Sequence, residues 1–252
     1  MMTIGGVLVV IGISLLAGAF VFALERLIPA SRRQPHNDVI GFVYAVIGVT
    51  YAVILALVVV ATWDTLDAAK ADTFTEASAL VQLDLYGHSL PPPEHAEIES
   101  LARQYARTVI DVEWPDLANH HASQRARAIY LQLQDAVQGQ QPTAPAAVAR
   151  YQQALDTVTD LGNARRERVD LATEGIPALL WVALGAGAVI AIGFAYFFGM
   201  KSTRLHALVM FSITLLITSL LLVPYELDYP FAGIRVSPAA FELALQRMGH
   251  VS

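Results

Sequence analysis

Four long runs of apolar residues alternate with polar segments along the chain. The runs are residues 4–24, 39–63, 176–198 and 205–223, and none contains Asp, Glu, Lys or Arg. A helix needs about 20 apolar residues to cross the hydrocarbon core of a bilayer. The pattern therefore predicts four transmembrane helices. The first run is interpreted as an uncleaved anchor, because no basic residue precedes it, as one would in a secretory signal peptide.

The four predicted spans form two hairpins with a polar block between them. The chain thus divides into a first hairpin (1–63), a polar domain (64–175), a second hairpin (176–223) and a tail (224–252). Both tight hairpin loops carry Lys or Arg, at Arg26, Arg32, Arg33, Lys201 and Arg204. Because short cytoplasmic loops are enriched in these residues, the tight loops are expected in the cytoplasm and the polar domain outside a cell membrane.

The polar domain has helical periodicity throughout. Apolar positions recur at intervals of three and four residues in the segments 64–89, 94–114, 123–137 and 147–174. The first segment continues the second span without a breaker, and Pro91-Pro92-Pro93 is expected to end it. Pro115 is expected to end the next helix. The prediction is an all-α integral membrane protein with four transmembrane helices in two hairpins and a helical extramembrane bundle between spans two and three.

Composition supports the membrane class and excludes several functions. Hydrophobic residues make up 55% of the 252 residues and charged residues only 15%, against about 25% charged in an average protein. The net charge of -6 argues against a nucleic-acid partner, which would require a basic surface. The chain contains no Cys and no nucleophile or phosphate-loop motif. No catalytic residue, cofactor site or metal site is predicted.

Small residues recur at helical spacing in the second and third spans. Such residues let transmembrane helices approach closely, where lipid provides no hydrophobic driving force. They are expected to mark faces for helix packing. The positions are Gly41, Ala45, Gly48 and Ala52 in the second span, and Gly187, Ala191 and Ala195 in the third.

The remaining faces of the second span are candidates for a pore lining. Val43, Ile47 and Ile54 lie opposite the small residues, and Tyr44 and Tyr51 form a stripe between the two faces. One interpretation is a weakly polar or apolar stripe that lines or gates a pore. The other is ordinary helix packing, in which the tyrosine hydroxyls bond to neighbouring helices.

Polar residues flank the second span at both ends. His36, Asn37 and Asp38 precede it, and Asp64 follows Trp63. Asn37 and Asp38 suit the start of a helix, where they can cap free N–H groups. Alternatively, His36, Asn37, Asp38 and Asp64 contribute to polar sites at the membrane surface, where Asp64 could join an acidic ring in an oligomer.

The segment HNDVIGFVYAVIGVTYAVILALVVVATWD at residues 36–64 resembles the signature of the bestrophin-like family of four-span membrane proteins, whose defining domain has no assigned function. Three further stretches agree: Glu76-Ala77, the segment RLHAL at 204–208, and the tail, with PFAG at 230–233 and VSP at 236–238. The resemblance covers nearly the whole chain.

The resemblance implies an oligomeric ion channel. True bestrophins are pentamers with four spans per subunit and a helical domain between the second and third, and apolar residues of the second span form their pore. The resemblance thus implies a lipid bilayer, further copies of this chain and inorganic ions as partners. It also implies a cytoplasmic helical domain, opposite to the orientation that the arginines favour. The alternative function is a non-conducting membrane scaffold or sensor whose acidic domain binds a partner.

Overall fold

The computed structural model describes residues 4–231 and 236–250, and all regular secondary structure in these residues is helical. Ala232 and Gly233 of the resemblance lie outside the described residues. The chain divides into two compact units. The membrane unit comprises Met1–Trp63 and Ile176–Asp228, and the extramembrane unit comprises Asp64–Gly175 and Tyr229–Ser252.

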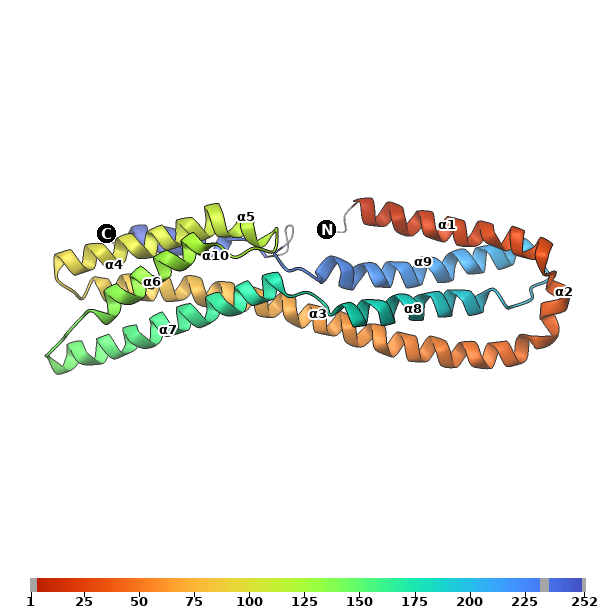
Figure 1. Ribbon diagram of the computed structural model, residues 1–252, viewed down its shortest axis with the longest axis horizontal. Helices are drawn as coiled ribbons and strands as arrows, with labels where there is room; N and C mark the ends of the chain where they lie inside the picture. The colour runs from red at the N-terminus through yellow and green to blue at the C-terminus, as the bar shows by residue number, and fades with distance from the viewer. Residues whose placement is uncertain (1–3, 232–235, 251–252) are drawn as a thin grey trace. The chain divides into compact units, whose positions relative to one another are not determined.

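Within the part of the chain that the structure describes, four helices are long and apolar enough to cross a membrane. In the membrane unit they run alongside one another (Figure 1). A short helix and a 3-10 turn join the first two. The elements are α1 (Ile4–Leu27), α2 (Ala30–Arg33), the 3-10 turn (Gln34–His36), the first part of α3 (Asn37–Gly87), α8 (Ala178–Ala195) and α9 (Thr203–Leu227).

The membrane unit buries only a narrow seam of each helix. Tyr51 and Leu55 of α3 pack against Leu184 and Ala188 of α8. The outer faces carry large exposed apolar side chains, such as Leu16 of α1 and Leu216 of α9. Such faces are unstable in water and stable in hydrocarbon, where only the backbone needs internal hydrogen bonds.

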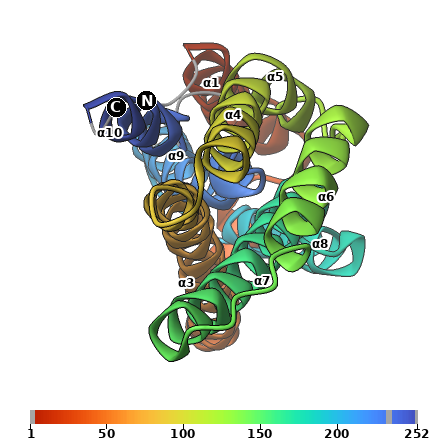
Figure 2. The same ribbon diagram turned by 90° about the vertical axis from the view of Figure 1, so that its left-hand side faces the viewer.

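The extramembrane unit is a bundle of amphipathic helices. Figure 2 shows the last part of α3 at one edge of a bundle with α4, α6 and α7, and α10 contacts α4. Its core is made of side chains such as Leu80, Ile98 and Leu133, all fully buried. The elements are the last part of α3, α4 (Pro92–Thr108), a π-helical turn (Val109–Glu113), α5 (Trp114–Leu117), α6 (Gln124–Gln138), α7 (Pro145–Thr173) and α10 (Ala239–His250).

The helix boundaries follow local signals at most places. Helix α3 is continuous over 51 residues and ends at Gly87, before the three prolines. Ser123 caps α6 by accepting a hydrogen bond from the backbone N–H of Ala126. This cap satisfies one of the free donors of the first turn.

Two predicted boundaries are wrong. Pro115 does not end its helix, because a π-helical turn directly before it widens the backbone and the chain continues as α5. Such a turn accommodates Pro115, which has no backbone N–H for the regular hydrogen bond of an α-helix. Pro224 does not begin the tail but lies inside α9, and the tail forms α10, which packs in the extramembrane unit.

Candidate functional site

Helix α3 has one face that packs inside the protomer. Tyr51, Leu55 and Val58 belong to a buried cluster with α8. The ring of Tyr51 lies over Gly187, where an added Cβ would come within 2.5 Å of it. Gly187 therefore provides the space for this ring, and the contact fixes α3 against α8.

The opposite face of α3 is left largely uncovered by the described residues of the protomer. Phe42, Val46, Val49, Val53 and Val60 are all more than half exposed. They recur at intervals of three, four and seven residues, so they lie on one side of the helix. The structure thus presents an apolar, uncharged face along the membrane part of α3.

The five predicted pore residues are divided between these environments. Tyr51 is buried, and Tyr44 packs edge-on against the ring of Phe198. Val43 and Ile47 are half-buried, whereas Ile54 is exposed. Tyr51 therefore lies in the protomer interior, Tyr44 is half-buried against Phe198, and Ile54 is the most accessible of the set.

The small residues behave differently in the two spans. In α8, Ala191 and Ala195 are buried in the protomer. In α3, Ala45 and Ala52 are exposed, and a Cβ at Gly48 would meet nothing within 4 Å. Gly41, also in α3, faces Phe198, 3.8 Å from where a Cβ would lie. The part of the stripe from Ala45 to Ala52 is thus available for a neighbour outside the protomer, whereas Gly41 packs inside it.

Arg33 joins the two tight loops of the membrane unit. It is 6% exposed and donates hydrogen bonds to the carbonyl oxygens of Tyr196 at 2.8 Å and Phe198 at 2.9 Å. Its guanidinium also pairs with Glu25. Arg33 therefore satisfies carbonyls that the end of α8 leaves without helical partners.

Asn37 and Gly199 complete this connection. The Asn37 amide donates to the Gly199 carbonyl at 3.0 Å and accepts from the Gly199 N–H at 2.9 Å. Asn37 thus uses its side chain on the loop after α8. His36 and Asp38 beside it are exposed, as is Asp64 at the far end of the membrane part of α3. The predicted surface residues therefore do not form one site.

The extramembrane unit contains a buried ion network that the sequence analysis missed. Arg168 donates to Glu76 at 2.6 and 3.0 Å and to Glu113 at 3.0 Å. Arg165 donates to Glu113 at 2.6 Å. Tyr105 donates to Glu76. Two carboxylates and two guanidiniums from α3, the π-helical turn and α7 therefore balance each other's charge.

The network lies in an almost water-free environment. Glu76, Glu113 and Arg168 have no exposed surface. Burial alone would lower the pKa of Arg168, but the Glu76 and Glu113 carboxylates raise it above its usual value, so the guanidinium stays charged. Burial and the neighbouring Glu76 carboxylate raise the pKa of Tyr105, so the phenol keeps its proton and donates it.

The sequence does carry a signal for this network. Arg165 and Arg168 continue the buried stripe of α7 at the spacing set by Val158, Leu161 and Ala172. A charged residue at a core position predicts a buried partner, because an unpaired charge there is too costly. The identity of the partners requires the arrangement of three helices.

A second group of carboxyls lies beside the network. The pKa of Asp72 is raised to about 6. Burial is the largest cause, and the charge of Glu167 and a hydrogen bond with it add to the effect. Asp72 is half-buried on α3. Because like charges close together disfavour ionisation, this carboxyl holds a proton more readily than an ordinary aspartate.

A model of the bestrophin-like domain matches residues 11–241. The chain belongs to the bestrophin-like family. No curated protein matches this sequence. As a member of the family with four apolar helices of spanning length, this bestrophin-like protein is a multi-pass membrane protein.

Solved structures agree with the fold. The chain is similar to two crystal structures of a bacterial bestrophin homologue from Klebsiella pneumoniae, each with a single substitution. The first structure shares 14% of its residues with this chain at a TM-score of 0.71, and the alignment covers 96% of this chain and 97% of the homologue. The second shares 13% at a TM-score of 0.70, with 96% and 98% covered. The bestrophin-like fold thus extends over both units.

Proposed function

We propose that this chain is the subunit of a homo-oligomeric ion channel of the bestrophin type, with α3 as the pore helix. The observation that carries the proposal is the free face of α3. It is apolar, it continues through the membrane segment, and it carries no formal charge between Val39 and Trp63. An apolar constriction of this kind can gate ions by dewetting.

The proposed ring uses three sides of α3. The Tyr51 side packs on α8 within the protomer. The exposed small side, with Ala45 and Ala52, packs against the Val43 and Ile54 side of the next copy, because small residues allow close helix approach. The face between these two sides, with Phe42, Val46, Val49, Val53 and Val60, then points to the axis. By analogy with bestrophins, the ring contains five copies.

The mass of the purified particle in mild detergent tests the assembly. We expect an oligomer for the natural chain and a shift to monomer for Ala52→Leu, which adds bulk to the predicted subunit contact. Ala23→Leu on the exposed face of α1 is the matched control and retains the oligomer. A monomer from the natural chain would contradict the assembly.

Current through planar bilayers tests conduction. Val53→Thr makes the proposed constriction more polar, so we expect a larger ion current from the same amount of oligomer. Tyr51→Phe is the control, since this side chain packs inside the protomer. A stable oligomer without current would instead favour the non-conducting scaffold, in which the acidic domain binds a partner.

The orientation is proposed from the exposed basic residues of the tight loops. Four basic residues of these loops are exposed: Arg26, Arg32, Lys201 and Arg204. Arg33 is buried and forms an ion pair with Glu25. We propose that these loops face the cytoplasm and the extramembrane unit faces outward. Cysteine labelling of whole cells tests this proposal, because an impermeant maleimide should modify Arg166→Cys and spare Lys201→Cys. The opposite labelling would reverse the orientation.

A further inference from the structure

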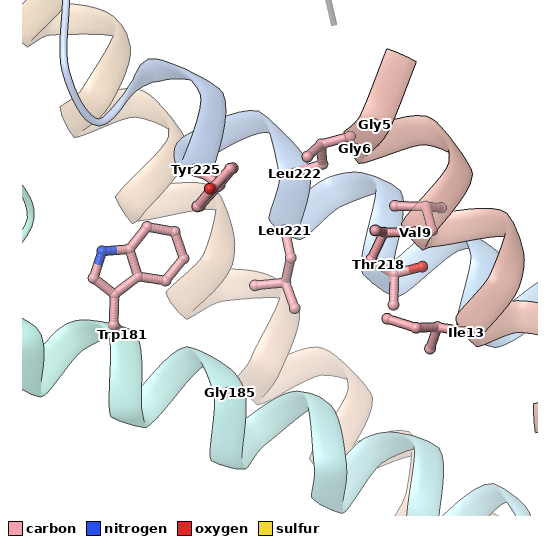
Figure 3. Close-up of a pocket in the computed structure, with 11 residues that line it drawn as sticks. Gly5, Gly6, Val9, Ile13, Trp181, Gly185, Thr218, Leu221, Leu222 and Tyr225 are labelled. Atoms are coloured by element: carbon pink, nitrogen blue, oxygen red, sulfur yellow. The ribbon is translucent and has the colours of Figure 1, made fainter. Parts of the chain in front are cut away.

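The membrane unit contains a cavity of about 510 Å³ between α1, α8 and α9 (Figure 3). Val9 and Ile13 of α1, Leu221 of α9 and Trp181 of α8 contribute to its walls. The volume falls in the range of about 300–1,000 Å³ that is typical of ligand sites. The pocket is open on one side and lies on helices of spanning length, so in a membrane it is accessible to lipid.

Two glycines leave the space open from opposite walls. Gly5 of α1 and Gly185 of α8 both line the cavity. A Cβ added to either would meet nothing within 4 Å. No neighbouring side chain therefore uses the room that these glycines provide, in contrast to Gly187, which Tyr51 covers.

The chemistry of the walls selects an apolar occupant. The hydroxyl of Thr218 donates to the Thr214 carbonyl of its own helix at 2.6 Å. The indole N–H of Trp181 donates to Asp228 at 3.3 Å. These groups are thereby satisfied, and the rest of the lining is almost entirely apolar. An almost entirely apolar lining favours an apolar ligand over water.

The cavity lies at the end of the unit opposite the arginine loops. Asp228, the last residue of the unit, also accepts from the backbone N–H of Ile176 at 2.5 Å and so joins the start of the third span to the end of the fourth. Trp181 and Tyr225 lie at this end of the cavity, and such aromatic residues prefer the membrane–water interface. The cavity therefore reaches from the interface into one leaflet.

The charges at this end select the headgroup. Glu226 and Asp228 are the formally charged residues of the membrane unit there, and the unit's Lys and Arg residues belong to its tight loops. Anionic headgroups are bound by basic clusters. Carboxylates instead favour a headgroup that carries an amine.

We propose that this cavity binds one acyl chain of phosphatidylethanolamine, with the amine headgroup at the Trp181, Tyr225 and Asp228 end. The site holds a lipid between α1 and the α8–α9 hairpin. It is distinct from the α3 face that the channel proposal uses, and it does not depend on conduction.

Photolabelling of the full chain in vesicles tests the site. The probe is phosphatidylethanolamine with a diazirine in its acyl chain, diluted into phosphatidylcholine vesicles. We expect labelled peptides from α1 around Val9 and from α8 around Gly185. Gly185→Leu fills the cavity and should lower this labelling by about tenfold, which corresponds to about 1.4 kcal/mol of binding free energy.

Matched variants keep the test decisive. Gly193→Leu, on the same helix but outside the cavity, should retain the label, since a Cβ there also meets nothing within 4 Å. Gly5→Leu fills the cavity from the other wall and replaces Gly185→Leu if that variant does not fold. Phosphatidylglycerol with the same diazirine chain should label more weakly.

Three results would overturn the proposal. One is equal labelling of all four spans that does not change in Gly185→Leu or Gly5→Leu. This result would show that only bulk lipid contacts the helices. Stronger labelling by the phosphatidylglycerol probe would contradict the headgroup preference. A photoreactive amino acid at position 185 that crosslinks to a second copy of the chain would show that a subunit covers the cavity instead of a lipid.

Discussion

The two units of this protein distribute apolar and charged side chains in opposite ways. The membrane unit exposes large apolar residues such as Phe42 and Leu16, whereas the extramembrane unit buries five acidic or basic residues, including Glu76 and Arg168. The first pattern is stable only when lipid is the solvent. The second is stable when a buried charge has a partner, as in the network of Arg168, or when burial raises the pKa of a carboxyl such as Asp84 and so favours its neutral form. The comparison shows that one chain meets two solvents and that the sources of stability change between them.

The largest expected effect tests the buried charges of the extramembrane unit. Arg168→Ala leaves Glu76 with only its neutral partner Tyr105, and Glu113 with only Arg165. Removing one partner of a buried ion pair costs about 3–5 kcal/mol. We expect a loss of this size in the free energy of unfolding, measured by urea denaturation of the purified protein.

The neighbouring exposed arginine provides the control for Arg168. Arg166→Ala should change stability by less than about 0.5 kcal/mol, as surface substitutions usually do. The double variant Arg168→Met with Glu76→Met should lose less than the sum of the two single variants, because it removes the attraction and the unpaired charge together. Equal effects of Arg166→Ala and Arg168→Ala would show that the network does not stabilise the unit.

The second prediction tests packing in the membrane unit. Gly187→Ala places a Cβ within 2.5 Å of the Tyr51 ring. Overpacking of this kind costs about 1–3 kcal/mol. We expect a lower thermal unfolding midpoint in detergent, partly restored by Tyr51→Leu. Gly193→Ala, with open space at its Cβ position, should leave the midpoint unchanged. A midpoint for Gly187→Ala equal to that of Gly193→Ala would show that this contact is absent.

The smallest expected effect concerns the pH dependence of the extramembrane unit. The pKa of Asp72 is raised from 3.8 to about 6, so the folded state binds a proton that the unfolded state releases. Stability should therefore fall as pH rises from about 4 to 6. Solvent near this half-buried group keeps the loss below about 1 kcal/mol. Asp72→Asn should remove this slope, and Asp67→Asn, an exposed carboxylate, should retain it.

Unfolding midpoints measured between pH 4 and 7 test this slope. Each variant is compared with the natural chain, so that the pH dependence of the other groups cancels. A slope that persists in Asp72→Asn would assign it to another carboxyl.

The sequence was sufficient to predict the spans and the helical domain. Lipid imposes long uncharged runs, and α3 ends at Gly87, shortly before the three prolines that locally indicate a helix boundary. Pro115 does not end its helix, because a π-helical turn precedes it and the chain continues as α5. The expectation that proline ends a helix assumes a regular α-helix before it, and the apolar spacing of this segment does not indicate the π-helical turn.

The site residues could be predicted only in part, for a related reason. Tyr44 and Tyr51 lie on one stripe of the helix, but the spacing does not indicate which helix packs against that stripe. Asn37 suited a helix cap, whereas its amide bonds with Gly199, 162 positions away. Partners this distant in the sequence follow from packing of helices, which the period of one helix does not determine.

Cysteine accessibility of α3 in the conducting channel is the most direct test of its assignment as the pore helix. The chain has no native cysteine, so each introduced thiol is the only target. A charged, water-soluble thiol reagent should rapidly block the current of Val53→Cys and leave that of Leu55→Cys, on the packed face, unchanged. Block of Leu55→Cys with Val53→Cys unaffected would place the pore elsewhere and contradict the proposed arrangement of α3.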